Sequence, residues 1–272
     1  MTITQATPQR AAVRRRRQPY LLVVLAAIGV LFLLLPLIGL LVRAPWQSVP
    51  HILAANDVTT ALRLSLETAT IATVLALIFG VPIAWCLARL DIRGRAVLRA
   101  LCTLPLVLPP VAGGIALLLA YGRNGVIGEW LLRALGLSLP FTTPGVVVAE
   151  TFVAMPFLIV SVEGALRGLD ARYDSAAATL GASRSYTFRH VTLPMLAPGI
   201  AAGAVLCWAR ALGEFGATIT FAGSYPGTTQ TMPLRVYLAL QDDPNAAIVL
   251  SLVLLAVSVA VLVGLRDRWL TT

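Results

Sequence analysis

Long uninterrupted apolar runs are the feature of this sequence that most limits the folds open to it. The first run extends from Tyr20 to Val42 without a charged residue, and about 20 apolar residues suffice for a helix to cross the hydrocarbon core of a bilayer. Because lipid offers no hydrogen bonds to the backbone, a spanning chain must be helical or a closed barrel, and continuous apolar runs favour helices. Further runs cover residues 60–90, 97–121, 145–166, 194–215 and 246–265. We therefore predict an all-α polytopic membrane protein with six transmembrane helices.

The composition supports this fold class. The chain is 58% hydrophobic and only 12% charged, which is far more apolar than one soluble core requires. The first run follows Arg14 to Arg17, as a secretory signal would, but it is longer than the ~7–15 apolar residues of such a signal and lacks a small-x-small cleavage site. We therefore expect a retained first transmembrane helix.

The arginines predict the orientation of the spans. The chain has no lysine, and its 21 basic residues are all arginines that lie between apolar segments instead of forming one basic face. This distribution argues against a nucleic-acid partner. Most arginines occupy alternate connections, at 10, 14–17, 89–99, 167–189 and 266–268, and positive residues in short loops stay on the cytoplasmic side. Both termini are therefore predicted to be cytoplasmic.

One membrane domain is predicted to account for most of the chain. We expect an arginine-rich cytoplasmic tail at 1–19, the first transmembrane helix at 20–42, a five-helix transmembrane domain at 60–265 and a short cytoplasmic tail at 266–272. Prolines and a glycine pair interrupt the second and third spans, where proline removes a backbone donor and kinks a helix. These interruptions are at Pro82, Pro105, Pro109, Pro110 and Gly113-Gly114.

The connection at 168–191 is longer than a helical hairpin needs and has helix signals of its own. Asp170 is suited to begin a helix, residues 176–180 are good helix formers, and Gly181 is suited to the left-handed position after a helix end. Ser183 can cap a second short helix. We predict two short helices that dock another protein; an amphipathic loop held on anionic lipid is the alternative.

The residue order in this connection resembles the cytoplasmic signature loop of binding-protein-dependent ABC importer permeases. In that family Glu-Ala-Ala is followed after three residues by Gly, and after nine more by Ile-x-Leu-Pro. The matching positions here are Ser175, Ala176, Ala177, Gly181, Val191, Leu193 and Pro194. Ser175 replaces the family's Glu, so the acidic contact would fall to Asp174. The resemblance implies that this loop, from Asp170 onward, inserts into a groove on a cytoplasmic ABC ATPase dimer.

Nucleotide is expected to bind to a partner and not to this chain. Without lysine the chain cannot carry the phosphate-binding loop whose Lys reaches the nucleotide phosphates. We therefore expect no cofactor on this chain, with ATP and Mg²⁺ in the partner ATPase, and no catalytic residue here.

The end of the fifth span holds charged residues at membrane depth. Arg210 and Glu214 are one helical turn apart, and Gly213 and Gly216 allow close approach of another backbone. Intramembrane charge is a functional hypothesis by default; an ion pair that only packs two helices is the alternative. The candidate residues of a translocation path or gate are Arg210, Gly213, Glu214, Phe215, Gly216, Thr218 and Thr220.

This segment, with the later Pro-Gly-Thr-Thr-Gln-Thr-Met-Pro-Leu that ends at Leu234, resembles molybdate importer permeases. The resemblance covers about 60–265 and includes the Leu-Pro-Leu-Val-Leu-Pro-Pro-Val stretch at 104–111. It implies a type I ABC importer fold in a prokaryotic cell membrane. It also implies molybdate or tungstate delivered by an extracytoplasmic binding protein, a second permease copy and alternating access. Sulfate permeases share the Glu-Phe-Gly part, so sulfate or another oxyanion is the alternative cargo.

Other polar residues are less specific. Glu150 has no partner nearby in the sequence, which leaves contact with the binding protein and snorkelling to the interface open. Hydroxyls on the second span could line a polar path or bond their own helix backbone; these are Ser65, Thr68 and Thr73. The two histidines and three cysteines lack metal-ligand spacing, so no metal site is predicted.

Two rival functions make different demands on the sequence. An ATPase-independent channel or secondary transporter would be expected to have paired half-repeats or a chain of buried acids. An intramembrane enzyme requires clustered catalytic or metal-binding residues. Neither pattern is evident, and the ABC permease remains the preferred interpretation.

Overall fold

The computed structural model describes the backbone of residues 20–170 and 172–269, and the side chains in those ranges except at 174, 175, 178, 184, 262 and 265–269. Two parts are described separately, residues up to Ala44 and residues from Pro45. The first part holds helix α1 (Tyr20–Val42), an apolar helix of 23 residues with Pro36 inside it. This helix confirms the first predicted span.

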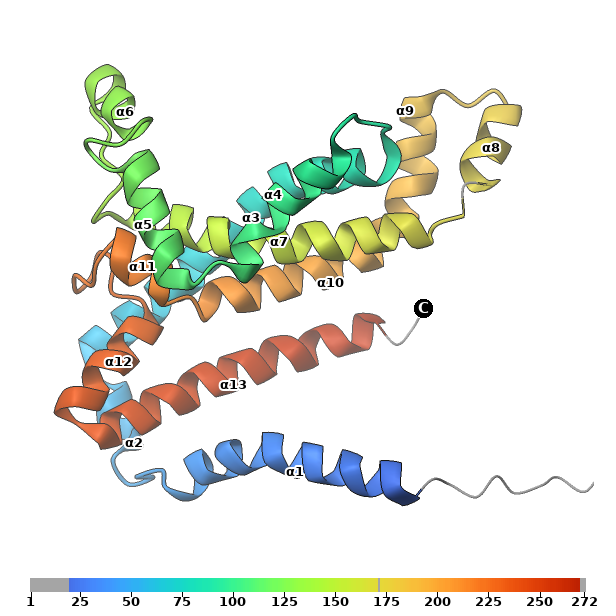
Figure 1. The fold of residues 1–272 in the computed structure, drawn as a ribbon. Helices are drawn as coiled ribbons and strands as arrows, with labels where there is room; N and C mark the ends of the chain where they lie inside the picture. The colour runs from blue at the N-terminus through green and yellow to red at the C-terminus, as the bar shows by residue number, and fades with distance from the viewer. Residues whose placement is uncertain (1–19, 171, 270–272) are drawn as a thin grey trace, which may run out of the picture. The chain divides into compact units, whose positions relative to one another are not determined.

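The second part is helical over most of its length (Figure 1). A π-helix over Phe188–Thr192 connects α9 directly to α10. The helices of this part are α2 (Val49–Leu53), α3 (Asn56–Arg89), α4 (Arg95–Val107), α5 (Pro110–Tyr121), α6 (Gly128–Leu135), α7 (Thr143–Gly168), α8 (Arg172–Thr179), α9 (Arg184–Thr187), α10 (Leu193–Leu212), α11 (Gly216–Phe221), α12 (Met232–Asp242) and α13 (Pro244–Trp269).

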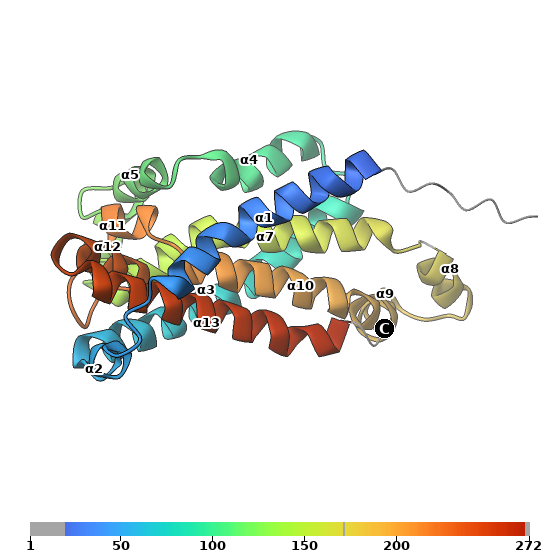
Figure 2. The same ribbon diagram turned by 90° about the horizontal axis from the view of Figure 1, so that it is seen from below.

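Helices α3, α7, α10 and α13 run side by side within this part, and α7 packs against both α3 and α10 (Figures 1 and 2). The turn from α3 to α4 lies at the same end as α8 and α9, whereas α2, α6, α11 and α12 lie at the other end (Figure 1). We call the first of these the arginine-rich end, because Arg89, Arg93, Arg95, Arg99, Arg167, Arg172 and Arg189 belong to it.

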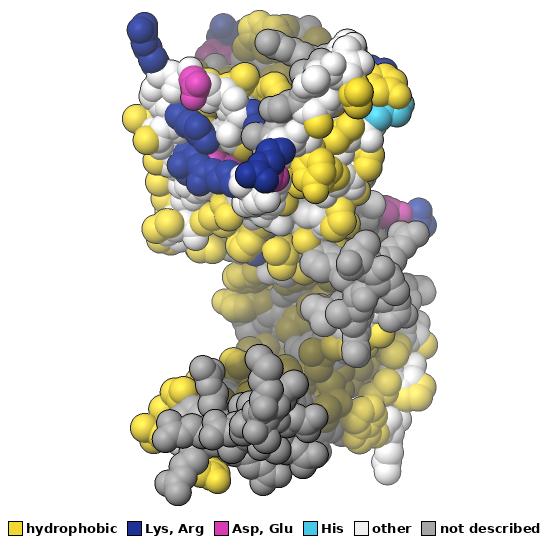
Figure 3. Space-filling view, turned by 90° about the vertical axis from the view of Figure 1, so that its right-hand side faces the viewer, with side chains coloured by type: hydrophobic (Ala, Val, Ile, Leu, Met, Phe, Trp, Pro, Cys, Tyr) yellow, Lys and Arg dark blue, Asp and Glu magenta, His cyan; other side chains and the backbone are white. Residues whose placement is uncertain are grey.

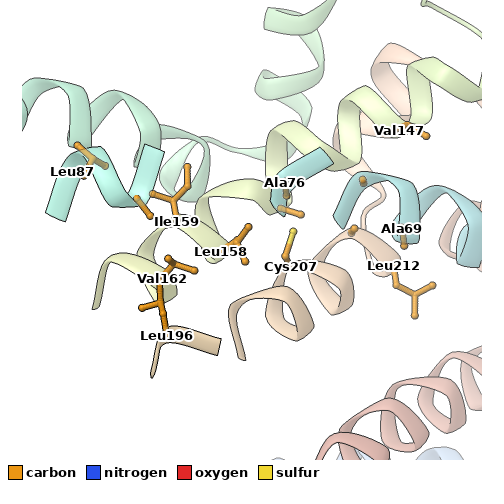
Figure 4. Packing of buried hydrophobic residues seen from close by; sticks show 14 of the residues in the cluster. Ala69, Ala76, Leu87, Val147, Leu158, Ile159, Val162, Leu196, Cys207 and Leu212 are labelled. Carbon is orange, nitrogen blue, oxygen red and sulfur yellow. The ribbon is translucent and has the colours of Figure 1, made fainter. Parts of the chain in front are cut away.

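Small side chains allow α3, α7 and α10 to pack closely. Ala69, Ala72 and Ala76 of α3 are fully buried, and Cys207 points from α10 toward Ala76 (Figure 4). A Cβ atom added to Gly199 of α10 would lie 2.5 Å from the Cβ atom of Ala165 on α7. Helices in lipid associate through van der Waals packing, which such small residues favour.

The six predicted spans are all present, but one of them is broken. Five helical segments have the length and hydropathy of a span: 20–42, 56–89, 143–168, 185–212 and 244–261. The predicted third span consists of α4 and α5, which together pass the same test but are bent by 118°. The break lies where Pro109 precedes Pro110, since a residue before proline is disfavoured in a helix.

Two connections contain further short helices. The segment after the fifth span forms the short helices α11 and α12, with α12 packed against α13. Both histidines lie in short helices, His51 in α2 and His190 in the π-helix.

Candidate functional site

The connection between α7 and α10 forms the two short helices predicted for it. Asp170 Oδ1 accepts a hydrogen bond from the backbone N–H of Arg172 at 2.9 Å, which caps the start of α8. Gly181 has φ +79°, the left-handed conformation that glycine adopts without a Cβ penalty. The backbone N–H of Tyr186 then donates to Ser183 Oγ at 3.3 Å, which caps α9. The structure thus confirms each local signal.

The outer surface of this connection is apolar. Leu180 is 88% exposed and Tyr186 is 55% exposed. A shallow hollow between α8 and α9 is lined by Ala177, Leu180, Gly181, Ala182, Ser183, Tyr186 and Val191. Figure 3 looks onto the arginine-rich end and shows arginine and apolar side chains together on that face. The side chains of Asp174 and Ser175, both predicted to contact the partner, lie outside the described residues.

The connection is joined to α10 without a break. The π-helix runs directly into Leu193, the first residue of α10, and Pro194 is the second residue of that helix. Phe188 packs edge-on against Trp85 near the end of α3, with ring centroids 6.4 Å apart. A displacement of α8 and α9 would therefore be transmitted to α3 as well as α10.

A buried acid cross-links the helices at this end. Glu163 of α7 is 5% exposed and accepts hydrogen bonds from Arg99 of α4 at 2.6 Å and from Arg167 at 2.8 Å. The pairing of Glu163 with Arg167 follows from their four-residue separation. The contact with Arg99, 64 residues away, has no local sequence signal and was not predicted.

At the other end of the bundle, Arg210 and Glu214 form an ion pair, with 2.6 Å between Arg210 Nη2 and Glu214 Oε2. Glu214 is 1% exposed, and its Oε1 atom accepts a hydrogen bond from the backbone N–H of Ala217 at 2.8 Å. The carboxylate therefore stabilises the N-terminus of α11 as well as pairing with Arg210. The Arg210 guanidinium and this backbone donor together compensate the buried charge.

The remaining candidate path residues bring α11 against α5. A Cβ atom added to Gly216 would lie 2.7 Å from the Cβ atom of Pro110, so this glycine permits the close approach predicted for it. Phe215 packs on Tyr237 of α12 with ring centroids 5.0 Å apart. Thr218 is fully buried, and Thr220 Oγ1 donates to the carbonyl of Gly216. Gly213, by contrast, is exposed.

Two hydroxyls of the second span, those of Ser65 and Thr68, form hydrogen bonds with distant elements. Ser65 Oγ accepts a hydrogen bond from the backbone N–H of Met232 at 2.7 Å, which ties α3 to the start of α12. Thr68 Oγ1 lies 2.9 Å from the carbonyl oxygen of Leu64 and 2.9 Å from Glu150 Oε1. Thr73 Oγ1 donates to the carbonyl of Ala69 in its own helix.

The buried position of Glu150 contradicts both interpretations given in the sequence analysis. The side chain is 1% exposed, so it neither snorkels to an interface nor reaches a binding protein. Instead it lies between α7 and α3, bonded to Thr68 across 82 residues of sequence. A lone acid in an apolar run signals burial as readily as it signals snorkelling, and only the three-dimensional packing distinguishes the two.

Within the described part of the chain, no group of three or more His, Cys, Asp or Glu side chains is placed to hold a metal ion. The three cysteines are free thiols, with Cys207 buried and Cys86 and Cys102 partly buried. The arrangement thus offers an exposed apolar surface at one end and buried polar residues around Glu214 toward the other.

Comparison with known proteins gives consistent matches. The chain is 49% identical over 245 residues, 89% of its length and 92% of the relative, to the molybdenum transport system permease protein ModB of Mycobacterium bovis. It is 40% identical over 210 residues (77% and 92%) to the protein of the same name from Escherichia coli K12. It is 36% identical over 240 residues (87% and 86%) to the sulfate transport system permease protein CysT of the latter organism.

Solved structures share the fold. A bacterial alginate ABC transporter, in complex with its alginate pentasaccharide-bound periplasmic protein, contains a chain that superposes with a TM-score of 0.71. The match covers 92% of this chain and 94% of that one at 18% sequence identity. Residues 73–272 match the family described as binding-protein-dependent transport system inner membrane component. The chain is therefore a member of this family of multi-pass ABC importer permeases.

Proposed function

We propose that the chain is the membrane-spanning permease subunit of an ATP-binding-cassette importer that moves molybdate, or its close analogue tungstate, into the cytoplasm. The observation that carries the proposal is the 49% identity to a molybdenum transport permease over 89% of the chain. The 36% identity to a sulfate permease makes sulfate the rival cargo.

The α8–α9 connection is the docking site for a cytoplasmic ATPase dimer. Its support is an exposed apolar surface at Leu180 and Tyr186 on two capped helices whose motion reaches α3 and α10. Candidate contacts are Asp170, Asp174, Ser175, Ala176, Ala177, Gly181, Leu193 and Pro194. The permease itself carries out no chemistry; the partner supplies ATP, Mg²⁺ and hydrolysis.

The orientation of the protein in the membrane follows from the proposed docking of the ATPase. The arginine-rich end faces the cytoplasm, in agreement with the retention of positive loops on that side, and the two termini are cytoplasmic. The opposite end, with α6, α11 and α12, receives an extracytoplasmic molybdate-binding protein. A second copy of the permease completes the enclosure of the path.

Transport proceeds by alternating access. ATP-driven closure of the ATPase dimer draws the α8–α9 connections of the two copies together, and the rigid link to α3 and α10 changes helix packing at the far end. There the backbone donors and hydroxyls around α11 offer a dianion weak, replaceable contacts, since a single strong fixed charge would trap it. Glu214 largely neutralises the charge of Arg210, so Arg210 can belong to the lining of such a path without trapping the dianion.

Uptake into vesicles tests the proposal. The permease, reconstituted with its ATPase and binding protein, should accumulate labelled molybdate only with ATP, and unlabelled molybdate or tungstate should compete better than sulfate. Stronger competition by sulfate would overturn the cargo assignment while leaving the importer intact. Accumulation by the permease alone, without ATPase, would overturn the importer assignment itself.

A further inference from the structure

Glu150 is the one described acid of the bundle whose surroundings do not fit an ionised side chain. Its residue is 1% exposed, and its Oε2 atom is buried without a hydrogen-bond partner in the described part of the chain. Its Oε1 atom lies 2.9 Å from the neutral hydroxyl of Thr68. A buried carboxylate ordinarily requires a cation or several donors, because its desolvation is costly.

The charged groups on the packed helices do not compensate Glu150. Arg210 on α10 is paired with Glu214, and Arg63 on α3 is paired with Glu67 on an exposed surface. Glu214 lies close enough for its negative charge to act on Glu150. An ionised Glu150 would therefore face a second carboxylate in a region of low dielectric constant, where like charges repel strongly.

The hydrogen-bond count favours a carboxylic acid. Thr68 has one hydroxyl proton but lies 2.9 Å from two acceptors, the carbonyl oxygen of Leu64 and Glu150 Oε1. An ionised carboxylate can only accept, so one of these contacts would lack a proton. If Glu150 carries the proton, its O–H donates to Thr68 Oγ1, and Thr68 in turn donates to Leu64. Both contacts are then hydrogen bonds.

We propose that Glu150 is a buried proton-bearing site that acts as a neutral hydrogen-bond donor between α7 and α3. It positions these helices without adding a second negative charge beside Glu214. The consequence for uptake, which rests on the proposed function, is that the outer half of the bundle does not repel an incoming dianion. Glu150 thus acts through its neighbours and need not touch the cargo.

Infrared spectroscopy tests the protonation state directly. The full-length permease, purified with its ATPase in an ester-free maltoside detergent, is compared at neutral pH with Glu150→Gln. The difference spectrum should contain the carbonyl stretch of one protonated carboxylic acid, which moves in D₂O. As a matched control, Glu214→Gln should remove carboxylate bands and leave that stretch in place. Its absence from the wild-type spectrum would overturn the proposal.

Two variants of Glu150 distinguish a neutral hydrogen-bond donor at this position from a negative charge that uptake requires. The amide of Glu150→Gln can donate to Thr68 as the acid does, so this variant should retain uptake within about twofold of wild type. Glu150→Ala removes the donor and should reduce uptake and thermal stability together. A normally assembled Gln variant that loses more than about tenfold in uptake would overturn the role of the neutral form. If molybdate is not the cargo, the infrared result still decides whether Glu150 holds a proton, and the thermal result still decides whether its side chain stabilises the packing of α7 on α3.

Discussion

At the arginine-rich end, the carboxylate of Glu163 accepts hydrogen bonds from three nitrogen atoms of two arginines. Arg99 approaches it with two nitrogen atoms, Nε at 3.0 Å and Nη2 at 2.6 Å, and Arg167 adds a third donor at 2.8 Å. The Glu163 side chain is 7% exposed while that of Arg99 is 33% exposed. Such a partly buried, bidentate pair is worth more than a surface ion pair, because fewer water molecules compete for it.

We expect Glu163→Ala to lower the free energy of unfolding by roughly 2 kcal/mol, because it leaves the Arg99 guanidinium without its partner in a partly buried position. The matched control is Glu129→Ala, which removes the exposed pair with Arg133 and should cost at most about 0.5 kcal/mol. Thermal unfolding in detergent measures both variants. Equal shifts in Tm would contradict the special role of Glu163.

Gly181 offers a second test on the scale of single residues. Its φ of +79° disfavours any side chain, yet a Cβ atom there would meet no neighbour. Gly181→Ala should therefore strain only the turn between α8 and α9, by about 1–2 kcal/mol. We predict weaker binding of the ATPase and slower uptake, measured by co-purification and vesicle assay.

Gly136 provides the control for this substitution, since it has φ +66° and equally open surroundings but lies after α6 at the opposite end. Gly136→Ala should carry a similar local cost and leave ATPase binding unchanged. If both substitutions weakened ATPase binding equally, the α8–α9 connection would not be the docking site.

Among the helices, α5 and α11 pack closely at Gly114, and a substitution can probe this contact. A Cβ atom on Gly114 would lie 2.6 Å from the Cβ atom of Thr220 and 2.9 Å from the carbonyl oxygen of Ala217. These atoms belong to backbone or to a short branched side chain, so they cannot simply rotate away. The two helices must separate if any side chain is introduced.

Gly114→Ala is accordingly expected to reduce Tm and to lower uptake through displacement of α11. Gly164→Ala is the matched control, because a Cβ atom there meets nothing within 4 Å. In a helix interior it should be neutral or stabilising by up to about 1 kcal/mol. The prediction fails if Gly114→Ala keeps wild-type Tm and uptake.

An element could be predicted from the sequence when the interactions that form it act between residues close together in the chain. Apolar runs locate the spans, and Asp170, Gly181 and Ser183 locate the short helices, since capping acts within a few residues. The 118° bend between α4 and α5 was predicted only as an interruption. Proline ends a helix locally, but the angle is set by what each half packs against.

The same limit applies to the candidate site. Arg210 and Glu214 could be paired from sequence because one helical turn separates them. The bonds from Arg99 to Glu163, Thr68 to Glu150 and Met232 to Ser65 span 64, 82 and 167 residues. No periodic pattern specifies such partners, so Glu150 was placed at a surface and its buried position was missed.

For the molecule as a whole, the uneven distribution of arginine predicts which surface faces the cytoplasm. We expect a single cysteine at position 183 to be protected from an impermeant maleimide in spheroplasts and to react after lysis. A cysteine at position 124 should react in both, because Asn124 lies in an exposed turn at the other end. The three native cysteines are replaced first. The reverse pattern of labelling would invert the proposed topology.

The bend between α4 and α5 also bears on how this segment is held in the membrane. These helices have 13 and 12 residues, and each is shorter than the ~17 residues that a helix needs to cross alone. Neither helix can therefore cross the hydrocarbon core by itself. The stability of this segment in the membrane depends on the packing of α4 and α5 against α7 and of α5 against α11.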